Sequence, residues 1–532
     1  MIWGGIKQNK FLLVIGILGL IFLFANLGNR YYWPDEIYTT AVSKELLKQG
    51  YPNVNEHPQL SHYEEYINEE GVWTLNSWSE YYITSLGFLV FGTTEFGGRF
   101  FFALIGFFTL FLFYFFVKDF TGKKDIACIS TFLLATSTIF YLFSRNAKYY
   151  SITMFAVILI LFSYKKFIEK KRYSSLYLIV SSLILFHTHI QIFLGVLAGV
   201  FFHYIAFELK NDWKRNGWRI VCVLFWTFVF SFPWFYLTDQ FSKTSYFQFS
   251  LLKIAFNLGL AGYYILLFGI PFIFLFFLPK IFFHNKKINK KYFILLFQII
   301  FVVIVVAILD NASTVSVRRL FVPLLPIFIL INGVIISKIK NYKKSLALII
   351  LVLFVFTNIL NLFPLYFLNS LQLENMNVNF GDNKEETDAM KLEFIEKSLE
   401  VRFYLFDLIY EITHDYISPD KEIINYLLKE SDREDSFITN GNQIIIYEYT
   451  GLKSIMFKHR PNDENINSVD WVIIRKHGYQ EFKEYLDANL DYNEYKKVTL
   501  PISDEAWESS PNPINHGFKT SREGEIVIYK RK

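Results

Sequence analysis

Long apolar runs recur along most of this chain and limit it to a membrane architecture. Phe, Leu and Ile return in runs of about 18 residues or more, the length that an α-helix needs to cross the ~30 Å hydrocarbon core of a bilayer. Of the 532 residues, 53% are hydrophobic and 60 are phenylalanine, a composition too apolar for an ordinary soluble protein. The sequence therefore predicts a polytopic α-helical membrane protein.

Eleven segments are predicted as spans. They are 11–27, 97–117, 125–143, 149–164, 175–189, 190–207, 218–237, 257–279, 291–309, 319–337 and 345–367. The first run is longer than the apolar part of a typical signal peptide, so we interpret it as a retained helix. The segment 81–91 is too short to span and suits a helix that lies in the outer membrane interface.

The basic residues between the spans predict the topology. Most of them fall in five connectors, at 118–124, 164–173, 209–219, 279–291 and 337–344. Connectors rich in Lys and Arg stay on the cytoplasmic side. The N-terminus is therefore expected inside, while the long first loop (29–96) and the region after about residue 368 are expected outside a plasma membrane.

Three regions follow from these patterns. Residues 1–370 form the membrane domain, and 371–420 are a polar, acidic and partly helical linker. Residues 421–532 are expected to form an extracytoplasmic α/β domain. There, strand-like stretches at 437–441, 469–475 and 524–532 alternate with amphipathic helical patterns at 421–430 and 480–490.

Two adjacent acids, Asp35 and Glu36, stand just beyond the first apolar run in the stretch "YYWPDEIYTT". The start of a helix explains this order of residues, because Pro followed by acids is common in the first turn of a helix. Gly50 would end that helix. A helix start does not explain why ionisable groups stand at the border of a membrane, where they more often mark functional sites. Both interpretations stay open at this point.

Four basic residues interrupt apolar sequence on the predicted outer side. Arg145 and Lys148 lie three residues apart, as neighbours on one helical face, and Arg318 and Arg319 enter a later span. Snorkelling to the membrane surface accounts for Lys148 as readily as a ligand does. For the arginines an anionic partner such as a phosphate is favoured, since a guanidinium offers two donors to one phosphate.

The turn "HTHIQ" carries His187 and His189, which could ligate a metal or form an ordinary polar turn. Metal dependence is therefore left open, with a divalent cation as one alternative. Cys128 and Cys222 lie inside apolar runs and indicate neither a disulfide framework nor a zinc site. The first loop is rich in aromatic residues, among them Trp78, which suit stacking on sugar rings or an interfacial aromatic belt.

Several segments, in the right order over residues 10–330, resemble the GT-C glycosyltransferases, in particular the branch with the protein O-mannosyltransferases and the lipid A aminoarabinose transferases. The segments are "WPDEIYTTAVSKELLKQGY" (33–51), "YYITSLGFLVFGTTEFGGR" (81–99), "SRNAKYYSITMF" (144–155, with Tyr150), "FPWFYL" (232–237) and "RLFVPLLP" (319–326). This resemblance implies a GT-C-like membrane domain that is catalytic.

The resemblance also implies a reaction: transfer of a sugar from a polyprenyl-phosphate donor to an acceptor hydroxyl, with inversion at the anomeric carbon. Asp35 would be the base and Glu36 its neighbour. Arg145, Lys148, Arg318 and Arg319 would bind the donor phosphate, and His187, His189, Trp78 and Tyr150 would assist substrate binding. The acceptor would be a lipid, a glycan or a protein, and membrane lipids would surround the enzyme.

Two other classes of protein compete with an enzyme. A lipid or glycan transporter would need polar or Gly/Pro-broken positions near the bilayer midplane, whereas the polar residues here collect at the outer ends of the spans. A sensor would need a cytoplasmic output module, which the short inner loops do not provide. Nothing in the sequence indicates a nucleic-acid partner.

Overall fold

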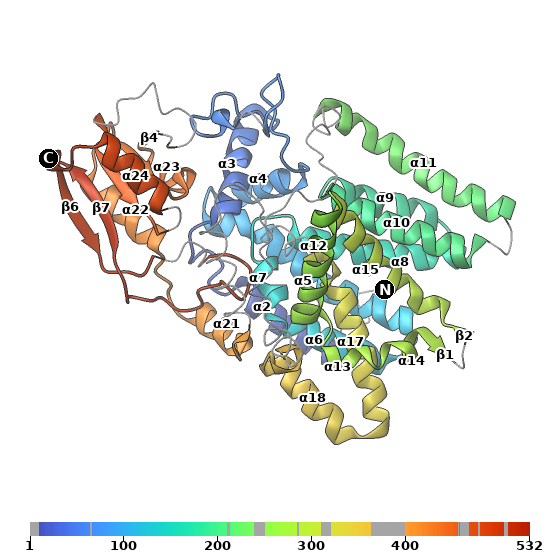
Figure 1. Ribbon diagram of the computed structural model, residues 1–532. Coiled ribbons are helices and arrows are strands. Elements are labelled where there is room, and N and C mark those ends of the chain that lie inside the picture. Colours follow the sequence, from blue (N-terminus) through green and yellow to red (C-terminus); the bar gives the residue numbers. More distant parts are fainter. Residues whose placement is uncertain are drawn as a thin grey trace.

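The protein is mostly helical, with one small sheet at one end (Figure 1). The structure, a computed structural model, describes residues 10–63, 66–209, 213–238, 250–284, 287–309, 321–362, 399–455, 457, 468–476, 479–504 and 509–532.

Within the described residues, six helices are long and apolar enough to cross a membrane. They are α5 (Glu95–Thr121), α8 (Tyr150–Ile168), α10 (Ile190–Phe207), α11 (Trp213–Leu237), α15 (Lys290–Leu309) and α17 (Leu325–Tyr342, with the 3-10 turn Val322–Leu324 before it).

Two further spans are bent, and three apolar helices are shorter. In the first bent span, α6 (Lys124–Ala135) and α7 (Thr138–Ser144) meet at an angle of 61°. In the second, the chain bends by 99° after α12 (Leu251–Tyr264) and the π-helical turn Ile265–Gly269, and continues as α13 (Phe272–Leu275) and α14 (Leu278–Phe282). The shorter helices are α2 (Lys10–Phe24), α9 (Ser174–Phe186) and α18 (Lys344–Phe356). Each predicted span overlaps one of these elements, although α2, α9 and α18 are shorter than a full span and residues 319–320 and 363–367 lie outside the described residues. The chain is a multi-pass membrane protein.

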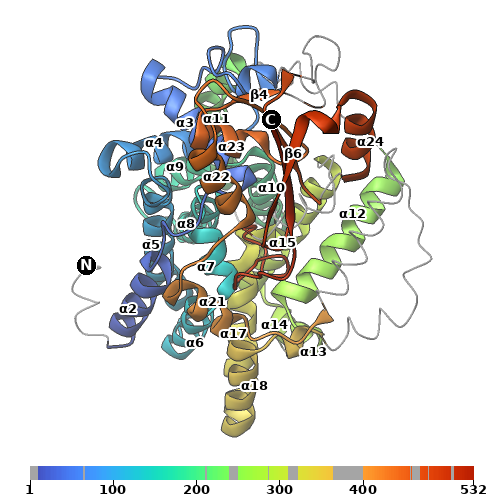
Figure 2. The same ribbon diagram turned by 90° about the vertical axis from the view of Figure 1, so that its left-hand side faces the viewer.

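The helices differ in how much of their surface other protein covers. In α17, 94% of the most apolar window is buried, which places this helix at the centre of the bundle. In α18 only Ala347 is buried, and the helix projects from the bundle in Figure 2. A helix that is apolar on all sides and exposed is suited to contact with lipid.

The first loop folds over one end of the bundle. It contains α3 (Pro34–Gln49), the 3-10 turn Leu60–His62 and α4 (Ser79–Phe91). Helix α4 packs on α3 and α5, and its other face leaves Leu86, Leu89 and Val90 exposed. A 13-residue helix with one covered and one exposed apolar face fits the predicted interfacial segment.

The C-terminal region forms a five-stranded sheet in the order β4-β3-β5-β7-β6. The strands are β3 (Ser436–Thr439), β4 (Lys453–Ile455), β5 (Trp471–Ile474), β6 (Tyr495–Leu500) and β7 (Ile526–Arg531). Strands β4, β3 and β5 are parallel, whereas β7 is antiparallel to both β5 and β6. Strands β3 and β5 are buried along their whole length, as is typical of parallel strands covered on both faces.

Three helices accompany this sheet, two of them at the predicted positions 421–430 and 480–490 and one, α23 (Gln443–Thr450), that was not predicted from the sequence. The other two are α22 (Pro419–Glu430) and α24 (Tyr479–Asn489). The proposed linker 371–420 lies outside the described residues up to 398, and its remainder contains α21 (Tyr404–Thr413).

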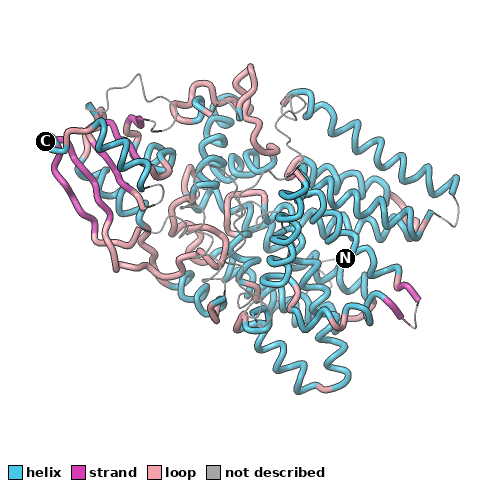
Figure 3. Tube along the Cα trace, in the orientation of Figure 1, coloured by secondary structure: helices cyan, strands magenta, loops and turns pink. Residues whose placement is uncertain are grey.

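The large sheet and the short hairpin of β1 (Phe283–His284) and β2 (Lys287–Ile288) lie at opposite ends of the molecule (Figure 3). The hairpin belongs to the basic connector 279–291.

Candidate active site

Helix α3 begins where the two acids stand. Pro34 occupies its first turn with Asp35 and Glu36, a favourable place for acids because the exposed N–H groups of a helix start carry partial positive charge. The Trp33 backbone N–H donates to Oε2 of Glu36 (3.2 Å). The helix ends at Gly50, whose φ of 82° is easily reached only without a side chain. The cap predicted from the sequence is therefore present, and Glu36 supplies it.

Glu36 is fully engaged in a buried ion pair with Arg99 of α5. Nε of Arg99 lies 2.8 Å from Oε1 of Glu36, and Nη2 lies 2.7 Å from Oε2. The backbone N–H of Ala147 also donates to Oε1 (2.7 Å). Because the Glu36 residue is 1% exposed, its carboxylate joins α3, α5 and the segment before α8 and has little access to a substrate.

A second buried acid, Glu80, holds Lys148. Nζ of Lys148 donates to Oε1 of Glu80 (2.8 Å) and to Oγ1 of Thr39 on α3 (3.0 Å). The backbone N–H of Tyr149 donates to Oε2 of Glu80 (3.1 Å). Thus Glu36 and Glu80 each accept a backbone N–H from the segment 144–149, which places that segment beside the start of α3.

Asp35 differs from both of these acids. Its residue is half-buried, whereas Glu36 and Glu80 are fully buried and each bound to a cation. Carboxylates buried with a matched cation act as fixed structural charges. Among these three acids, Asp35 is the least buried residue.

Arg145 closes the end of the first membrane helix. Its Nη1 donates to the carbonyls of Phe22 (2.9 Å) and Ala25 (2.8 Å), and its Nη2 donates to that of Asn26 (3.2 Å). These bonds satisfy carbonyls that a helix C-terminus leaves without partners. Arg318 and Arg319 lie outside the described residues. Phosphate binding by these three arginines stays a prediction.

The C-terminal region forms one wall of the site through α23. The backbone N–H of Tyr32 donates to Oη of Tyr449 (3.2 Å), and this hydroxyl donates to Oε1 of Glu95 (2.8 Å). The rings of Tyr31 and Tyr449 stack with centroids 4.1 Å apart. The residues just before Asp35 are therefore held by α23.

Next to Tyr449 on α23, Glu448 binds two basic side chains of the first loop. Its Oε2 lies 2.6 Å from Nζ of Lys44, and its Oε1 lies 2.9 Å from Nε2 of His57. Burial alone would raise the pKa of Glu448, but His57 and Lys44 outweigh it and hold this pKa below its usual value.

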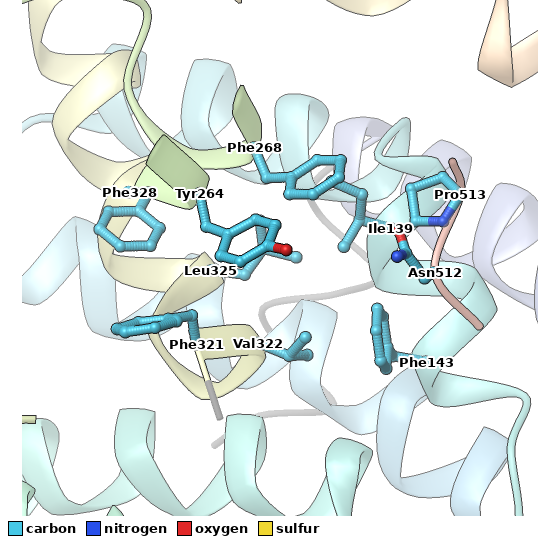
Figure 4. A pocket seen from close by; sticks show the side chains of 10 residues that line it. All are labelled: Ile139, Phe143, Tyr264, Phe268, Phe321, Val322, Leu325, Phe328, Asn512 and Pro513. Atoms are coloured by element: carbon cyan, nitrogen blue, oxygen red, sulfur yellow. The ribbon is translucent and has the colours of Figure 1, made fainter. Parts of the chain in front are cut away.

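A small apolar cavity of about 40 Å³ lies near the segment 144–149. Its walls come from α7, α12, the π-helical turn, the start of α17 and one loop of the C-terminal region (Figure 4). The lining residues are Ile139, Phe143, Tyr264, Phe268, Phe321, Val322, Leu325, Phe328, Asn512 and Pro513. The hydroxyl of Tyr264 and the amide of Asn512 bring polar atoms to the otherwise apolar walls.

Comparisons with known proteins show which families and solved structures this chain resembles. Residues 79–236 match the family model described as dolichyl-phosphate-mannose-protein mannosyltransferase. An uncharacterized protein of Aquifex aeolicus (strain VF5) is 32% identical over 213 residues, which are 38% of this chain and 39% of that protein. The match thus spans about two fifths of the length of this relative.

The chain also resembles solved structures over almost its whole length. Two crystal structures of ArnT from Cupriavidus metallidurans, one apo and one bound to undecaprenyl phosphate, each have a TM-score of 0.56 at 10% identity and cover 98% of both chains. This chain has the GT-C fold. The likeness takes in the C-terminal sheet as well as the membrane helices, and the family match 79–236 contains Glu80, Arg99 and Lys148.

Within this GT-C fold, the two histidines lie in the turn between α9 and α10. The ring of His189 lies 4.6 Å from that of Tyr149. Burial, and secondarily the charge of Lys148, lower the pKa of His189 to about 4, so its ring is neutral near pH 7. Burial also lowers the pKa of His187. His189 thus adjoins the Lys148 segment but adds no positive charge there at neutral pH.

Trp78 and Tyr150 contribute mainly to packing around the site. Nε1 of Trp78 donates to the Trp73 carbonyl (3.1 Å), and its ring meets that of Trp234 edge-on. Tyr150 is buried and its ring contacts those of Phe143 and Tyr149. Sugar binding by either residue stays a prediction.

The described part of the chain contains no obvious metal site. There, no group of three or more His, Cys, Asp or Glu side chains is arranged to hold an ion. The acids nearest Asp35 already bind Arg99 and Lys148. Glu36 and Glu80, which are bound by cationic side chains, therefore do not fit a metal site.

Sequence reasoning missed Glu80, Glu448 and Tyr449. For Glu80 a signal existed: an acid directly before an apolar interfacial segment suggests a buried carboxylate that needs a cation such as Lys148. For Glu448 and Tyr449 no local signal exists, because their partners lie more than 350 residues away along the chain.

Proposed function

We propose that this protein is an integral-membrane glycosyltransferase that moves a sugar from a polyprenyl-phosphate donor to an acceptor hydroxyl on the extracytoplasmic face of the plasma membrane. The observation that carries the proposal is the half-buried Asp35 at the end of the first membrane helix. It lies beside two buried acids that are each bound by a cation, within a GT-C fold.

The reaction is a single displacement at the anomeric carbon. A carboxylate oxygen of Asp35 takes the proton of the acceptor hydroxyl, and the acceptor oxygen forms the new bond to the anomeric carbon. The bond from that carbon to the phosphate oxygen breaks on the opposite face, and the lipid phosphate leaves with the electron pair. Configuration at the anomeric carbon inverts.

The surrounding residues serve this step by fixing Asp35. Glu36 anchors the start of α3 to Arg99, and Lys148 anchors the next turn of the same helix through Thr39. A base that is held in one place lowers the barrier because its orientation costs no further entropy in the transition state.

The donor class rests on the similar proteins. ArnT is seen bound to undecaprenyl phosphate, and the matching family is described by a dolichyl-phosphate-linked sugar. A lipid, a glycan and a protein remain acceptors to be compared, and none of the comparisons supports a transporter.

The test uses purified protein in proteoliposomes with radiolabelled undecaprenyl-phosphate sugars, both hexoses and pentoses. Asp35→Asn keeps the shape of the side chain but removes the base, so transfer should fall by roughly 10²- to 10⁴-fold, the range typical of a lost general base. Membrane insertion and elution volume should stay as in the wild type.

Glu70→Gln is the matched control, because it neutralises an exposed acid of the same loop. It should transfer sugar at the wild-type rate. Turnover of Asp35→Asn close to that of Glu70→Gln would disprove the role of Asp35. A wild-type protein that transfers none of the sugars, but moves the labelled lipid across the bilayer, would overturn the enzyme assignment.

A further inference from the structure

Helix α21 carries apolar side chains on two faces. Toward the protein it buries Leu405, Leu408 and Ile412. Away from the protein it exposes Phe403 (50%), Phe406 (54%), Ile409 (38%) and Tyr410 (39%). An outward face of a water-soluble helix is normally charged, so these four side chains are an unusual surface for a helix in water.

The charged side chains of α21 do not lie on this outward face. Glu411 is buried against Arg30 and His516, and Asp407 lies at the edge of the face with Lys519 at 3.8 Å. With 3.6 residues per turn, positions 406, 409 and 410 lie on one side of the helix, and Phe403 stands immediately before its start. Phe403, Phe406 and Ile409 therefore form an apolar stripe. Tyr410 lies at its edge, where the ring of His414 stacks on it and Nζ of Lys519 lies 5.1 Å from its ring centroid.

Both ends of α21 are fixed at the ends of membrane helices. Before its start, the backbone N–H of Arg402 donates to Oδ1 of Asn358, just beyond α18 (2.9 Å). After its end, Nδ2 of Asn29, just beyond α2, donates to the carbonyl of His414 (3.2 Å). Figures 1 and 2 both show α21 beside the bundle, between the sheet and α18.

The outward stripe continues onto the surface of α18. The rings of Phe406 and Phe356 stack with centroids 5.5 Å apart. Helix α18 exposes apolar side chains along its length, including Leu348 (61%). Helix α2 likewise exposes Leu13, Val14 and Ile17, so the two helices that hold α21 are both suited to contact with lipid.

We propose that α21 lies in the membrane surface and inserts Phe403, Phe406, Ile409 and Tyr410 into the outermost part of the acyl layer. The occupant of the stripe is thus the bilayer. Helices of this kind bury an apolar face about 5–10 Å into the headgroup boundary. Helix α21 then ties the C-terminal sheet region to the membrane plane, and this assignment does not depend on the proposed enzymatic activity.

A cysteine-directed fluorophore reports the surroundings of the stripe in the full-length protein. In a background with Cys128→Ala and Cys222→Ala, Phe406→Cys and Tyr410→Cys are labelled with a polarity-sensitive dye. The proteins are placed in phosphatidylcholine/phosphatidylglycerol nanodiscs, with or without lipid that carries a nitroxide quencher on carbon 5 of its acyl chain.

Leu428→Cys is the matched control, because Leu428 on α22 is 56% exposed and apolar but lies in the sheet region. Dyes at positions 406 and 410 should emit at shorter wavelength and be quenched about twofold or more by the nitroxide lipid, as shallow insertion requires. The dye at 428 should show neither effect and should be quenched by aqueous iodide.

Two results would overturn the proposal. Equal behaviour of the dyes at 406, 410 and 428 would place the stripe in water. Protection from iodide without quenching by the nitroxide lipid would show that protein covers the stripe, either another part of this chain or a second copy. Elution of each labelled protein at the wild-type volume confirms that it is folded.

Discussion

At the scale of single residues, the site is defined by how each charge is compensated. Burial of a charge is costly unless a matched partner and hydrogen bonds replace the lost water. Glu36 has Arg99 and the Ala147 N–H, and Glu80 has Lys148 and the Tyr149 N–H. Both pairs are therefore expected to be sensitive to the loss of either partner.

The Glu36–Arg99 pair is testable by a double-mutant cycle. Arg99→Met leaves the Glu36 carboxylate buried without its cation and should lower the free energy of unfolding by about 3–5 kcal/mol, the range found when one partner of a buried pair is removed. The combination Arg99→Met/Glu36→Gln should recover part of this loss, because no buried charge then remains. Unfolding in detergent micelles measures the free energy of unfolding of each single variant and of the double variant. If the losses of the two single variants add up to the loss of the double variant, the coupling is contradicted.

His189 makes stability depend on pH. Its folded pKa of about 4 lies below the value of about 6.5 expected in an unfolded chain. The unfolded state therefore binds the proton first as the pH falls, so stability is complete above about pH 6.5 and declines toward pH 4. His189→Gln should lose less thermal stability between pH 7 and pH 5 than the wild type; an equal loss would contradict this assignment.

At the scale of helices and strands, the interfacial helix α4 crosses α5 at very short range. A Cβ on Gly87 would lie only 2.0 Å from the carbonyl oxygen of Gly97, so the crossing requires glycine. This close approach brings Glu80, in the first turn of α4, down to Lys148. Helix packing thus brings Glu80 to Lys148, whereas the local sequence indicates only that an acid at this position needs a cation.

Gly87→Ala should force α4 away from α5 and destabilise the protein by about 1–3 kcal/mol, as overpacking does elsewhere. The matched control is Gly262→Ala in α12, where an added Cβ meets no atom within 4 Å. There, alanine should be neutral or slightly stabilising, because it favours the helix over glycine. Apparent unfolding temperatures in detergent compare the two, and equal effects would contradict the packing argument.

At the scale of the whole molecule, two of the contacts that bind the C-terminal region to the membrane domain involve buried carboxylates. At the first, α23 holds the residues before Asp35 through Tyr449 and Glu448. At the second, Glu411 binds Arg30 (3.1 Å) and His516 (2.8 Å). Burial alone would raise the pKa of Glu411, but Arg30 and His516 hold it well below its usual range, so this contact persists under acidic conditions.

Tyr449→Phe tests whether this docking matters for the proposed reaction. It removes the hydroxyl that binds Tyr32 and Glu95 but keeps the ring that stacks on Tyr31. Two hydrogen bonds of about 1 kcal/mol each correspond to roughly tenfold or more in rate if they act in the transition state. We therefore expect kcat to fall about tenfold while KM for the donor changes little.

The control for Tyr449→Phe is Tyr426→Phe on α22, where the ring packs on Trp471 of the sheet. This variant should retain the wild-type kcat. A Tyr449→Phe protein with unchanged kcat would show that α23 only covers the site and does not position it.

The sequence predicts the elements well because their signals are local. Each span follows from a run of apolar residues, and β3, β5 and β7 follow from short buried-strand patterns. The helix start at Pro34, Asp35 and Glu36 is likewise predicted from adjacent residues. The two acids are adjacent in sequence yet differ in burial and partners, and no pattern of spacing distinguishes them.

The sequence by itself determined that the chain spans a membrane several times and that an acidic pair follows its first apolar run. Both features can be predicted because hydrophobicity and helix caps act over a few neighbouring residues. Only the tertiary structure decided that Glu36 belongs to Arg99, Lys148 to Glu80 and Tyr32 to Tyr449, which are 63, 68 and 417 residues apart. Such pairs form because a buried charge or N–H must find a partner wherever packing brings one near.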